Sequence, residues 1–379
     1  MGKPRSARVH ARQQFLEALL SGGKVAAMPD RAFLAWTDHL SLEGRPDRPV
    51  PVLGRKTSMH NALKRSLRRP LTKKIVLEPG GRLRVDDRGL AGMLTKHGTL
   101  FVKPAYLGMG IGLGRGVMRL ELMGNHVRVT SRDAKLLEVL LLHQPRDAKR
   151  TNNYTVDIAC ADNRLPQTLS WLLKEYTAFG MTQQWQTNPN AKRLDILAER
   201  GLRIPPYNGK VWEVRQLLLA RPGKRLKPMA AYAKVGANRF VANLALGGHG
   251  EPPEHVVKTV YRSLLPQADR KRIEALAQKF MKQLQSESLT AAKLVSKYLE
   301  RIRKRKYKDY PLGRVRVSNF SVDFAAEWDV KRNCLVPVII DADFYAKIKG
   351  LHSINQALAR EVEAGIKEIQ EAFVLRHMK

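Results

Sequence analysis

The sequence predicts an α+β protein of several domains in which helices predominate. Three observations support this: a length of 379 residues, a hydrophobic content of 44%, and apolar residues that recur at helical spacing along much of the chain. A chain of this kind buries a sizeable core, and one domain takes about 100–200 residues. We therefore expect four regions, which are residues 1–130, 131–204, 205–310 and 311–379.

The first region is expected to be a basic α/β segment that contains a β-hairpin. Residues 117–122 and 126–130 alternate apolar and polar side chains, and Gly124-Asn125 lies between them. Alternation on both sides of a short turn is typical of two antiparallel strands.

A glycine-rich run precedes this hairpin. Glycine occupies every second position from Gly108 to Gly116, but Leu113 and Arg115 stand where the third glycine of a G-x-G-x-x-G motif is required. Without that spacing we infer no nucleotide cofactor. The favoured interpretation is a packed or flexible strand, and the alternative is a close approach to a phosphate backbone, assisted by Arg115.

The second region combines helices with short strands. A helix, a short strand, a short helix, a longer helix and two strands are expected in turn over residues 133–143, 154–156, 157–162, 164–178, 181–187 and 193–199. This order resembles the winged helix-turn-helix domains of DNA-binding proteins and, loosely, plasmid and phage replication initiators. The resemblance covers residues 131–201.

The resemblance implies a recognition helix and a wing. In winged-helix proteins the helix enters the major groove and the wing contacts flanking DNA. Because Leu172 and Leu173 mark the apolar side of the helix, other residues of the helix point outward as candidate base contacts. The candidates are Arg164, Gln167, Thr168, Trp171 and Lys174 on the helix, and Lys192 and Arg193 in the wing.

The last two regions are expected to be a basic helical domain and a C-terminal α/β unit. Consecutive prolines, Pro205-Pro206, predict the boundary before the helical domain. Helices are expected over residues 210–220, 228–246, 273–284 and 289–302. Strands followed by a long helix are expected over residues 311–379.

Basic residues far outnumber acidic ones. The chain has 68 Lys and Arg against 34 Asp and Glu, a formal net charge of +34 and a pI near 10.5. Such an excess favours binding to nucleic acids, because cations that neutralise phosphates release counterions. Further candidate nucleic-acid contacts are Lys64, Arg65, Arg68, Arg69, Lys224, Arg225, Arg301, Arg303, Lys304, Arg305, Lys306 and Lys308.

These observations together predict a protein that binds duplex DNA in replication initiation or transcription control of a mobile element. An RNA-binding component of a ribonucleoprotein assembly is one alternative. A Mg²⁺-dependent nuclease is another, because Asp341 and Asp343 follow a predicted strand and would share one of its faces. No residue is assigned a catalytic role, and an enzyme is the less favoured class.

Several other classes of protein are not expected. Cys160 and Cys334 are far apart and have no potential metal ligands at suitable spacing, so neither a disulfide framework nor a zinc site is predicted. No apolar run approaches the ~20 residues of a membrane span. We expect a cytoplasmic protein without cofactor or metal, with a homo-oligomer or a protein complex as open alternatives.

Overall fold

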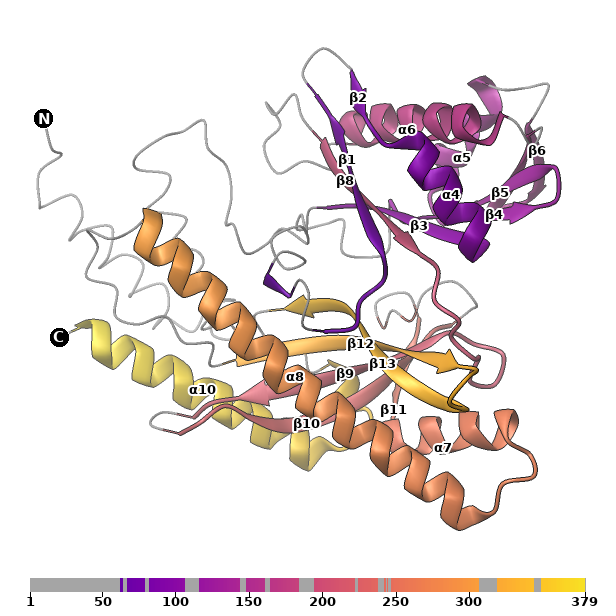
Figure 1. The fold of residues 1–379 in the computed structure, drawn as a ribbon. Coiled ribbons are helices and arrows are strands. Elements are labelled where there is room, and N and C mark those ends of the chain that lie inside the picture. The colour runs from indigo at the N-terminus through magenta and orange to yellow at the C-terminus, as the bar shows by residue number, and fades with distance from the viewer. Residues whose placement is uncertain are drawn as a thin grey trace, which may run out of the picture. The chain divides into compact units, whose positions relative to one another are not determined.

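The computed structural model describes residues 62–378, apart from 64–66, 79–81, 106–115, 144–147, 161–163, 184–193, 222–223, 238–241, 243, 245–246, 307–318 and 344–348. The described chain forms two compact units (Figure 1). Unit 1 holds residues 62–68 and 204–378, and unit 2 holds residues 69–203.

Unit 2 is built on an eight-stranded antiparallel sheet. Its strands are β1 (Thr72–Leu77), β2 (Leu83–Arg84), β3 (Thr99–Pro104), β4 (Met118–Met123), β5 (His126–Ser131), β6 (Ala148–Asn152), β7 (Thr155–Ala159) and β8 (Leu194–Arg200). They lie in the order β2-β1-β8-β3-β4-β5-β7-β6, and every neighbouring pair is antiparallel. The last strand in sequence, β8, therefore lies between β1 and β3.

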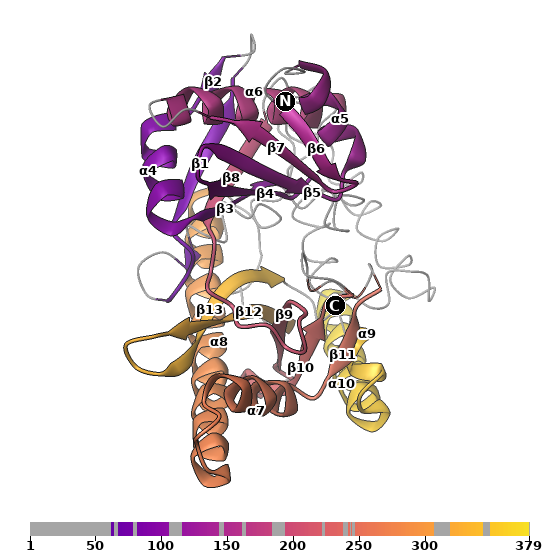
Figure 2. The same ribbon diagram turned by 90° about the vertical axis from the view of Figure 1, so that its right-hand side faces the viewer.

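Three helices cover one face of this sheet: α4 (Asp87–His97), α5 (Ala134–His143) and α6 (Leu165–Thr182) (Figure 2). Leu94, Leu137 and Leu172 from the three helices share one core with Val102 and Ile196 of the sheet. Among the described residues of unit 2, no helix covers the other face. That helix-free face carries polar and charged side chains at alternate positions, as expected for an antiparallel sheet with one covered face.

The predicted hairpin is confirmed. β4 pairs with β5 from Met118–Ser131 to Met123–His126, so Gly124 and Asn125 form the turn. Gly124 has a φ of 59°, a left-handed conformation that glycine adopts without a steric penalty.

The predicted winged helix is wrong. Two of the expected helices exist as α5 and α6, but residues 157–159, expected to begin a short helix, belong to β7, and Met181 and Thr182 belong to α6 instead of beginning a strand. The other wing strand, β8, pairs with β1 and β3 in the middle of the sheet. Local periodicity locates a helix or a strand, but it does not determine which distant strand becomes its neighbour.

Unit 1 is built on a five-stranded antiparallel sheet in the order β11-β10-β9-β12-β13. The strands are β9 (Trp212–Leu219), β10 (Lys227–Val235), β11 (His249–Glu251), β12 (Asn319–Asp329) and β13 (Cys334–Asp343). The helices are α7 (Pro253–Leu264), α8 (Arg270–Lys306), α9 (Lys349–His352) and α10 (Gln356–Met378).

Helices cover both faces of the unit 1 sheet. Leu217 and Tyr232 pack on one face against Leu351 of α9 and Val362 of α10. The register places Val214, Ala233 and Phe324 on the opposite face. Contacts of α8 with β9, β12 and β13, and of α7 with β10, complete the layers.

The predicted helices over residues 210–220 and 228–246 are wrong, because β9 and β10 occupy most of these ranges. Both faces of β9 are buried. Its first half alternates Trp212 and Val214 with Glu213 and Arg215, and its second half ends in a run of three leucines over residues 217–219. A short apolar run of this kind does not distinguish a buried strand from a buried helix. The chain contains two large antiparallel sheets, so the expectation of a predominantly helical protein is wrong.

No helix in the described ranges combines the length and the apolar character needed to cross a lipid bilayer.

Replacing Gly350 by Ala is expected to destabilise unit 1. A Cβ atom there would lie 2.5 Å from Cε2 of Tyr232 and 2.7 Å from Cδ1 of Leu244, closer than van der Waals contact allows. Relieving the overlap should cost about 1–3 kcal/mol. The measurement is the midpoint of urea unfolding. Gly92→Ala is the control, since its Cβ would meet nothing within 4 Å and should stabilise α4. Equal midpoints for both variants would contradict the expectation.

Candidate functional site

The candidate base-reading residues lie on α6 or at its N-terminus. Arg164, Gln167 and Lys174 are exposed, whereas Thr168 is half-buried. Trp171 is also half-buried and packs against the core of unit 2. The structure therefore accounts for this tryptophan without a partner molecule.

The remaining candidate cations are divided between the two units. Arg68, Lys224, Arg225 and Arg301 are exposed in unit 1, and Arg69 is half-buried in unit 2. The backbone of Arg303, Lys304, Arg305 and Lys306 is helical at the end of α8. Lys64, Arg65, Lys192, Arg193 and Lys308 lie outside the described residues.

A row of three side chains crosses the helix-free face of unit 2. Leu197 of β8 pairs in register with Lys74 of β1 on one side and with Lys103 of β3 on the other. Directly opposed residues of an antiparallel pair share a face, so the two lysines flank Leu197. Leu197 is only 2% exposed although it lies away from the helices.

Carboxylates hold both lysines of this row. Nζ of Lys103 lies 2.6 Å from Oε2 of Glu199, and both side chains are largely buried, at 12% and 6% exposure. Nζ of Lys74 lies 3.0 Å from Oδ2 of Asp195, where the lysine is 42% exposed. Lys103 is thus a fixed and nearly buried cation, while Lys74 is its more exposed counterpart.

Arg69 adds a second cation near Glu199. Burial lowers the pKa of the Arg69 guanidinium, and the charge of Glu199 opposes that shift. Nη1 of Arg69 is buried and has no hydrogen-bond partner among the described residues. We call Arg69, Lys103 and Glu199 the β3–β8 cluster.

One residue of the β3–β8 cluster, Lys103, lies shortly before the glycine-rich run in the sequence. Lys103 and Pro104 end β3, the glycines at every second position from 108 to 116 follow, and β4 starts at Met118. Gly116, the last of them, has a φ of 75°, and its carbonyl accepts a hydrogen bond from the buried Tyr176 hydroxyl. The available signal was a lysine near the end of a strand with a glycine-rich run beginning five positions later, an arrangement that the G-x-G-x-x-G and Walker patterns do not include.

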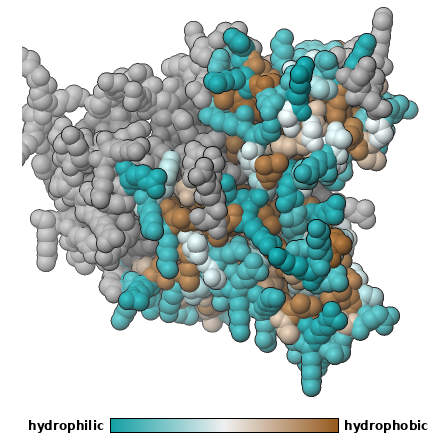
Figure 3. Space-filling view, viewed as in Figure 1, coloured by the Kyte–Doolittle hydropathy of each residue, from teal (hydrophilic) through white to brown (hydrophobic). Residues whose placement is uncertain are grey.

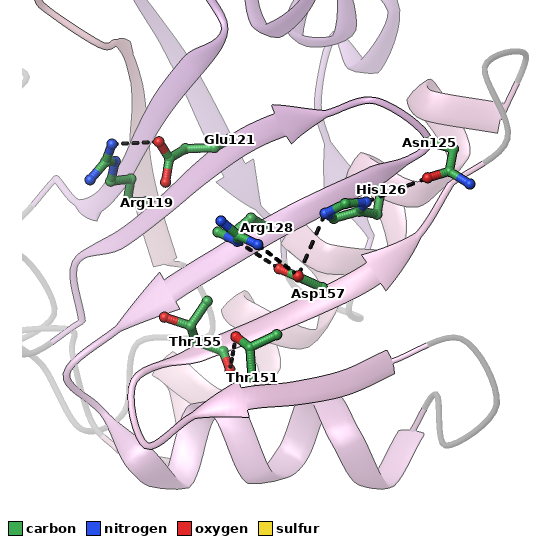
Figure 4. Close-up of polar contacts among 8 residues, drawn as sticks. All are labelled: Arg119, Glu121, Asn125, His126, Arg128, Thr151, Thr155 and Asp157. Atoms are coloured by element: carbon green, nitrogen blue, oxygen red, sulfur yellow. Dashed lines mark hydrogen bonds and ion pairs between the residues drawn. The ribbon is translucent and has the colours of Figure 1, made fainter.

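A second charged group lies further along the same face (Figure 4). Arg128 of β5 donates two hydrogen bonds to Asp157 of β7, at 2.9 and 3.0 Å, and His126 lies 3.5 Å from the same carboxylate. The hydrogen bonds from Arg128 hold the pKa of Asp157 below its usual range. Arg119 and Glu121 of β4 form a separate pair at 2.5 Å.

Unit 1 contains a more deeply buried set of charges, the β9–β12 cluster of Glu213, Arg215, Lys234 and Asp323. The register places all four on the sheet face that α9 and α10 partly cover. Nε and Nη2 of Arg215 each donate to one oxygen of Asp323 at 2.6 Å. Nζ of Lys234 donates to Asp323 at 2.8 Å and also contacts Glu213.

The pKa values of the two acids of the β9–β12 cluster are shifted in opposite directions. Burial alone would raise the pKa of Asp323, but the charges and hydrogen bonds of Arg215 and Lys234 outweigh it and hold that pKa far below the usual range. Burial raises the pKa of Glu213, with Lys234 opposing it only in part. Asp323 is therefore the main counter-ion of the two cations, and Glu213 accepts a proton first.

Asp341 and Asp343 lie at the end of β13, on the face that carries Asp323. Asp341 pairs in register with Asp323, and Asp343 pairs with Ser321. Among the described side chains, however, no group of three or more His, Cys, Asp or Glu residues is arranged to hold a metal ion. The two hydrogen bonds from Arg215 and one from Lys234 already engage both oxygens of Asp323.

No family model and no curated protein sequence matches the chain. D-cycloserine synthetase DcsG aligns with 93% of this chain and 80% of its own, at 12% identity and a TM-score of 0.43. D-alanyl-alanine synthetase A from Vibrio cholerae O1 biovar eltor aligns over 86% and 66%, at 8% identity and a TM-score of 0.36. Biotin carboxylase from Campylobacter jejuni, in complex with β,γ-ATP, aligns over 84% and 46%, at 10% identity and a TM-score of 0.39. The chain thus spans about half of the carboxylase's length.

The expectation of a winged-helix protein that reads duplex DNA is wrong. The expected recognition helix, α6, is one of three helices on an eight-stranded antiparallel sheet, and the expected wing strand, β8, lies in the middle of that sheet. The expected nucleic-acid partner, the alternatives of an RNA-binding component and a nuclease, and the resemblance to replication initiators are corrected with it.

Proposed function

We propose that this chain is an ATP-dependent enzyme of the ligase class, which binds Mg·ATP on the helix-free face of unit 2. The observation that carries the proposal is Lys103, a nearly buried cation at the end of β3, five positions before Gly108, the first residue of the glycine-rich run. We place the activity in the cytoplasm, where ATP is available.

The position of Lys103 suits contact with a phosphate group. An ammonium group has three donors, and Glu199 fixes Lys103 at 2.6 Å in one direction. A lysine whose position is fixed loses less side-chain entropy when a phosphate binds. Arg69 supplies a second cation beside the same carboxylate. Charged hydrogen bonds to phosphate are about twice as strong as neutral ones.

The sequence after Lys103 supports the same role. Glycine has no side chain, so a glycine-rich segment allows backbone N–H groups to approach phosphate oxygens closely.

Unit 1 contains a separate set of buried cations, which the proposed nucleotide site on unit 2 does not include. Arg215 and Lys234 are buried cations, and Asp323 holds both of them in fixed positions. We propose that Mg²⁺ arrives with the nucleotide as Mg·ATP.

Thermal unfolding of the full chain tests this proposal. Mg·ATP at 100 times its dissociation constant should stabilise the folded chain by about 2.7 kcal/mol and raise the unfolding midpoint. AMP, which lacks the β- and γ-phosphates, should raise it much less. ADP release on addition of small carboxylic acids and amines would then identify the ligase substrates. An unchanged midpoint at millimolar Mg·ATP, or an equal shift with AMP, would rule out recognition of the triphosphate.

A further inference from the structure

A row of cations follows the outer side of α8. Successive residues of an α-helix are rotated by 100°, so residues 271 to 297 can be sorted by direction around its axis. A sector of about 100° contains Lys271, Arg272, Lys279, Lys282, Lys293 and Lys297, all of them exposed. At about 1.5 Å per residue this cationic row is about 40 Å long.

Between residues 271 and 297, this sector contains no acidic residue. The acids of α8 between residues 271 and 297 are Glu274 and Glu287, and both fall on other sides of the helix. Glu274 pairs with Arg270 at 2.9 Å, and Glu287 accepts a hydrogen bond from Gln283 at 2.9 Å. No cation of the row forms an ion pair with another side chain in the described part of unit 1.

Cations aligned without counter-ions repel one another, and the helix would be more stable with acids interspersed at spacings of three or four residues. The opposite side of α8 buries Ile273, Phe280 and Leu284, so the orientation of the row is fixed by the core. The electrostatic potential outside the helix is therefore positive along the whole row. In 0.1 M salt it extends about 10 Å from the surface, which is the screening length.

We propose that the cationic row of α8 binds an extended acidic polypeptide segment of a partner protein. Three properties of the surface favour this occupant: the row is narrow and straight, it is about as long as 12 residues of extended chain, and amide and hydroxyl groups lie beside it. Gln278, Gln285 and Ser286 are exposed next to the cations and can hydrogen-bond a peptide backbone.

An anionic membrane is the less suitable occupant. A helix that inserts into a lipid surface exposes large apolar side chains beside its cations. The large hydrophobic side chains exposed in the described ranges are Leu71, Met123, Leu142, Tyr154 and Val330, and none of them lies on α8. Figure 3 shows hydrophilic side chains over much of the described surface of unit 1 in this view.

The test is binding of fluorescently labelled poly-L-glutamate of about 15 residues to the full chain. The triple variant Lys279→Gln/Lys282→Gln/Lys293→Gln should bind about tenfold more weakly at 50 mM salt, which corresponds to about twofold per exposed ion pair. The control, Lys96→Gln/Lys135→Gln/Lys149→Gln, removes three exposed lysines from unit 2 and the same total charge. It should change the affinity less than twofold.

Equal weakening in both triple variants would overturn the proposal, because it would show a response to net charge alone. Absence of poly-L-glutamate binding by the parent chain would overturn it as well. Phosphatidylserine vesicles provide a further arm, and loss of vesicle binding in the α8 variant without any loss of poly-L-glutamate binding would assign the row to a membrane. Circular dichroism of each variant verifies that α8 remains folded, and the assay contains no ATP, so its result is independent of the proposed ligase activity.

Discussion

The Lys103→Met variant is expected to bind Mg·ATP about 10- to 100-fold more weakly than the parent chain. This range corresponds to about 1.5–3 kcal/mol for hydrogen bonding between charged groups. The lysine is nearly buried and held by Glu199, so no neighbouring flexible lysine replaces it readily. Equilibrium dialysis with labelled ATP at constant Mg²⁺ measures the change.

Two further variants separate a binding role of Lys103 from a purely structural one. Lys74→Met removes the other lysine of the same row, whose partner is Asp195, and should change ATP affinity less than threefold. The double variant Lys103→Met/Glu199→Gln avoids leaving a buried carboxylate without its lysine, so its fold should be retained. If this double variant binds ATP as tightly as the parent, Lys103 does not contact the nucleotide.

The Asp323→Asn variant is expected to be about 3–5 kcal/mol less stable than the parent chain, the usual effect of removing one partner from a buried ion pair. Arg215 and Lys234 both depend on this carboxylate, and the side chains of Arg215 and Asp323 are only 8% and 7% exposed. Urea unfolding at pH 7 provides the measurement.

Asp157→Asn is the matched control. Asp157 pairs with Arg128 through two hydrogen bonds, but the arginine side chain is 34% exposed. A partly exposed pair contributes about 1 kcal/mol or less. A loss in Asp323→Asn no larger than that in Asp157→Asn would show that the β9–β12 cluster is not an important source of stability.

The contribution of Asp323 should also depend on pH. Its folded-state pKa lies below the ordinary value of about 3.9, so the unfolded chain takes up a proton at a higher pH than the folded chain does. The stabilisation is therefore complete above about pH 5 and declines as the pH falls through 4 and below. Unfolding curves at pH 7 and pH 3.5 should show the gap between parent and Asp323→Asn narrowing at the lower pH.

Local patterns in the sequence identify several elements correctly. The alternation around Gly124-Asn125 predicts the hairpin of β4 and β5. The leucines of α6 predict which side faces the core, since Leu172 and Leu173 are buried while Gln167 and Lys174 are exposed. These elements are predictable because the signal and the structure involve the same few residues.

The arrangement of the sheets is not predictable in this way. β8 lies between β1 and β3, more than 90 residues apart from each, and nothing in its own residues specifies those neighbours. β9 and β10 lie in a sheet covered by helices on both faces, so alternation is confined to part of β9, and an apolar run such as residues 217–219 does not distinguish a strand from a helix. Long-range pairing and two-sided burial thus account for the errors in fold class.

The candidate site could not be predicted from the sequence for a similar reason. Lys103 and Glu199 are 96 positions apart in sequence and meet only because β3 and β8 pair. The glycine-rich run is visible in the sequence, but its spacing matches no common nucleotide motif. The same holds for Arg215 and Asp323, which are brought together by the pairing of β9 with β12.

Calorimetric titration of the full chain with Mg·ATP tests the central claim most directly. We predict one saturable site per chain that persists at 0.3 M salt, because the bound triphosphate is held by a few fixed groups as well as by the net charge of +34. The absence of saturable binding at millimolar ATP, or several weak sites that disappear with added salt, would contradict the account.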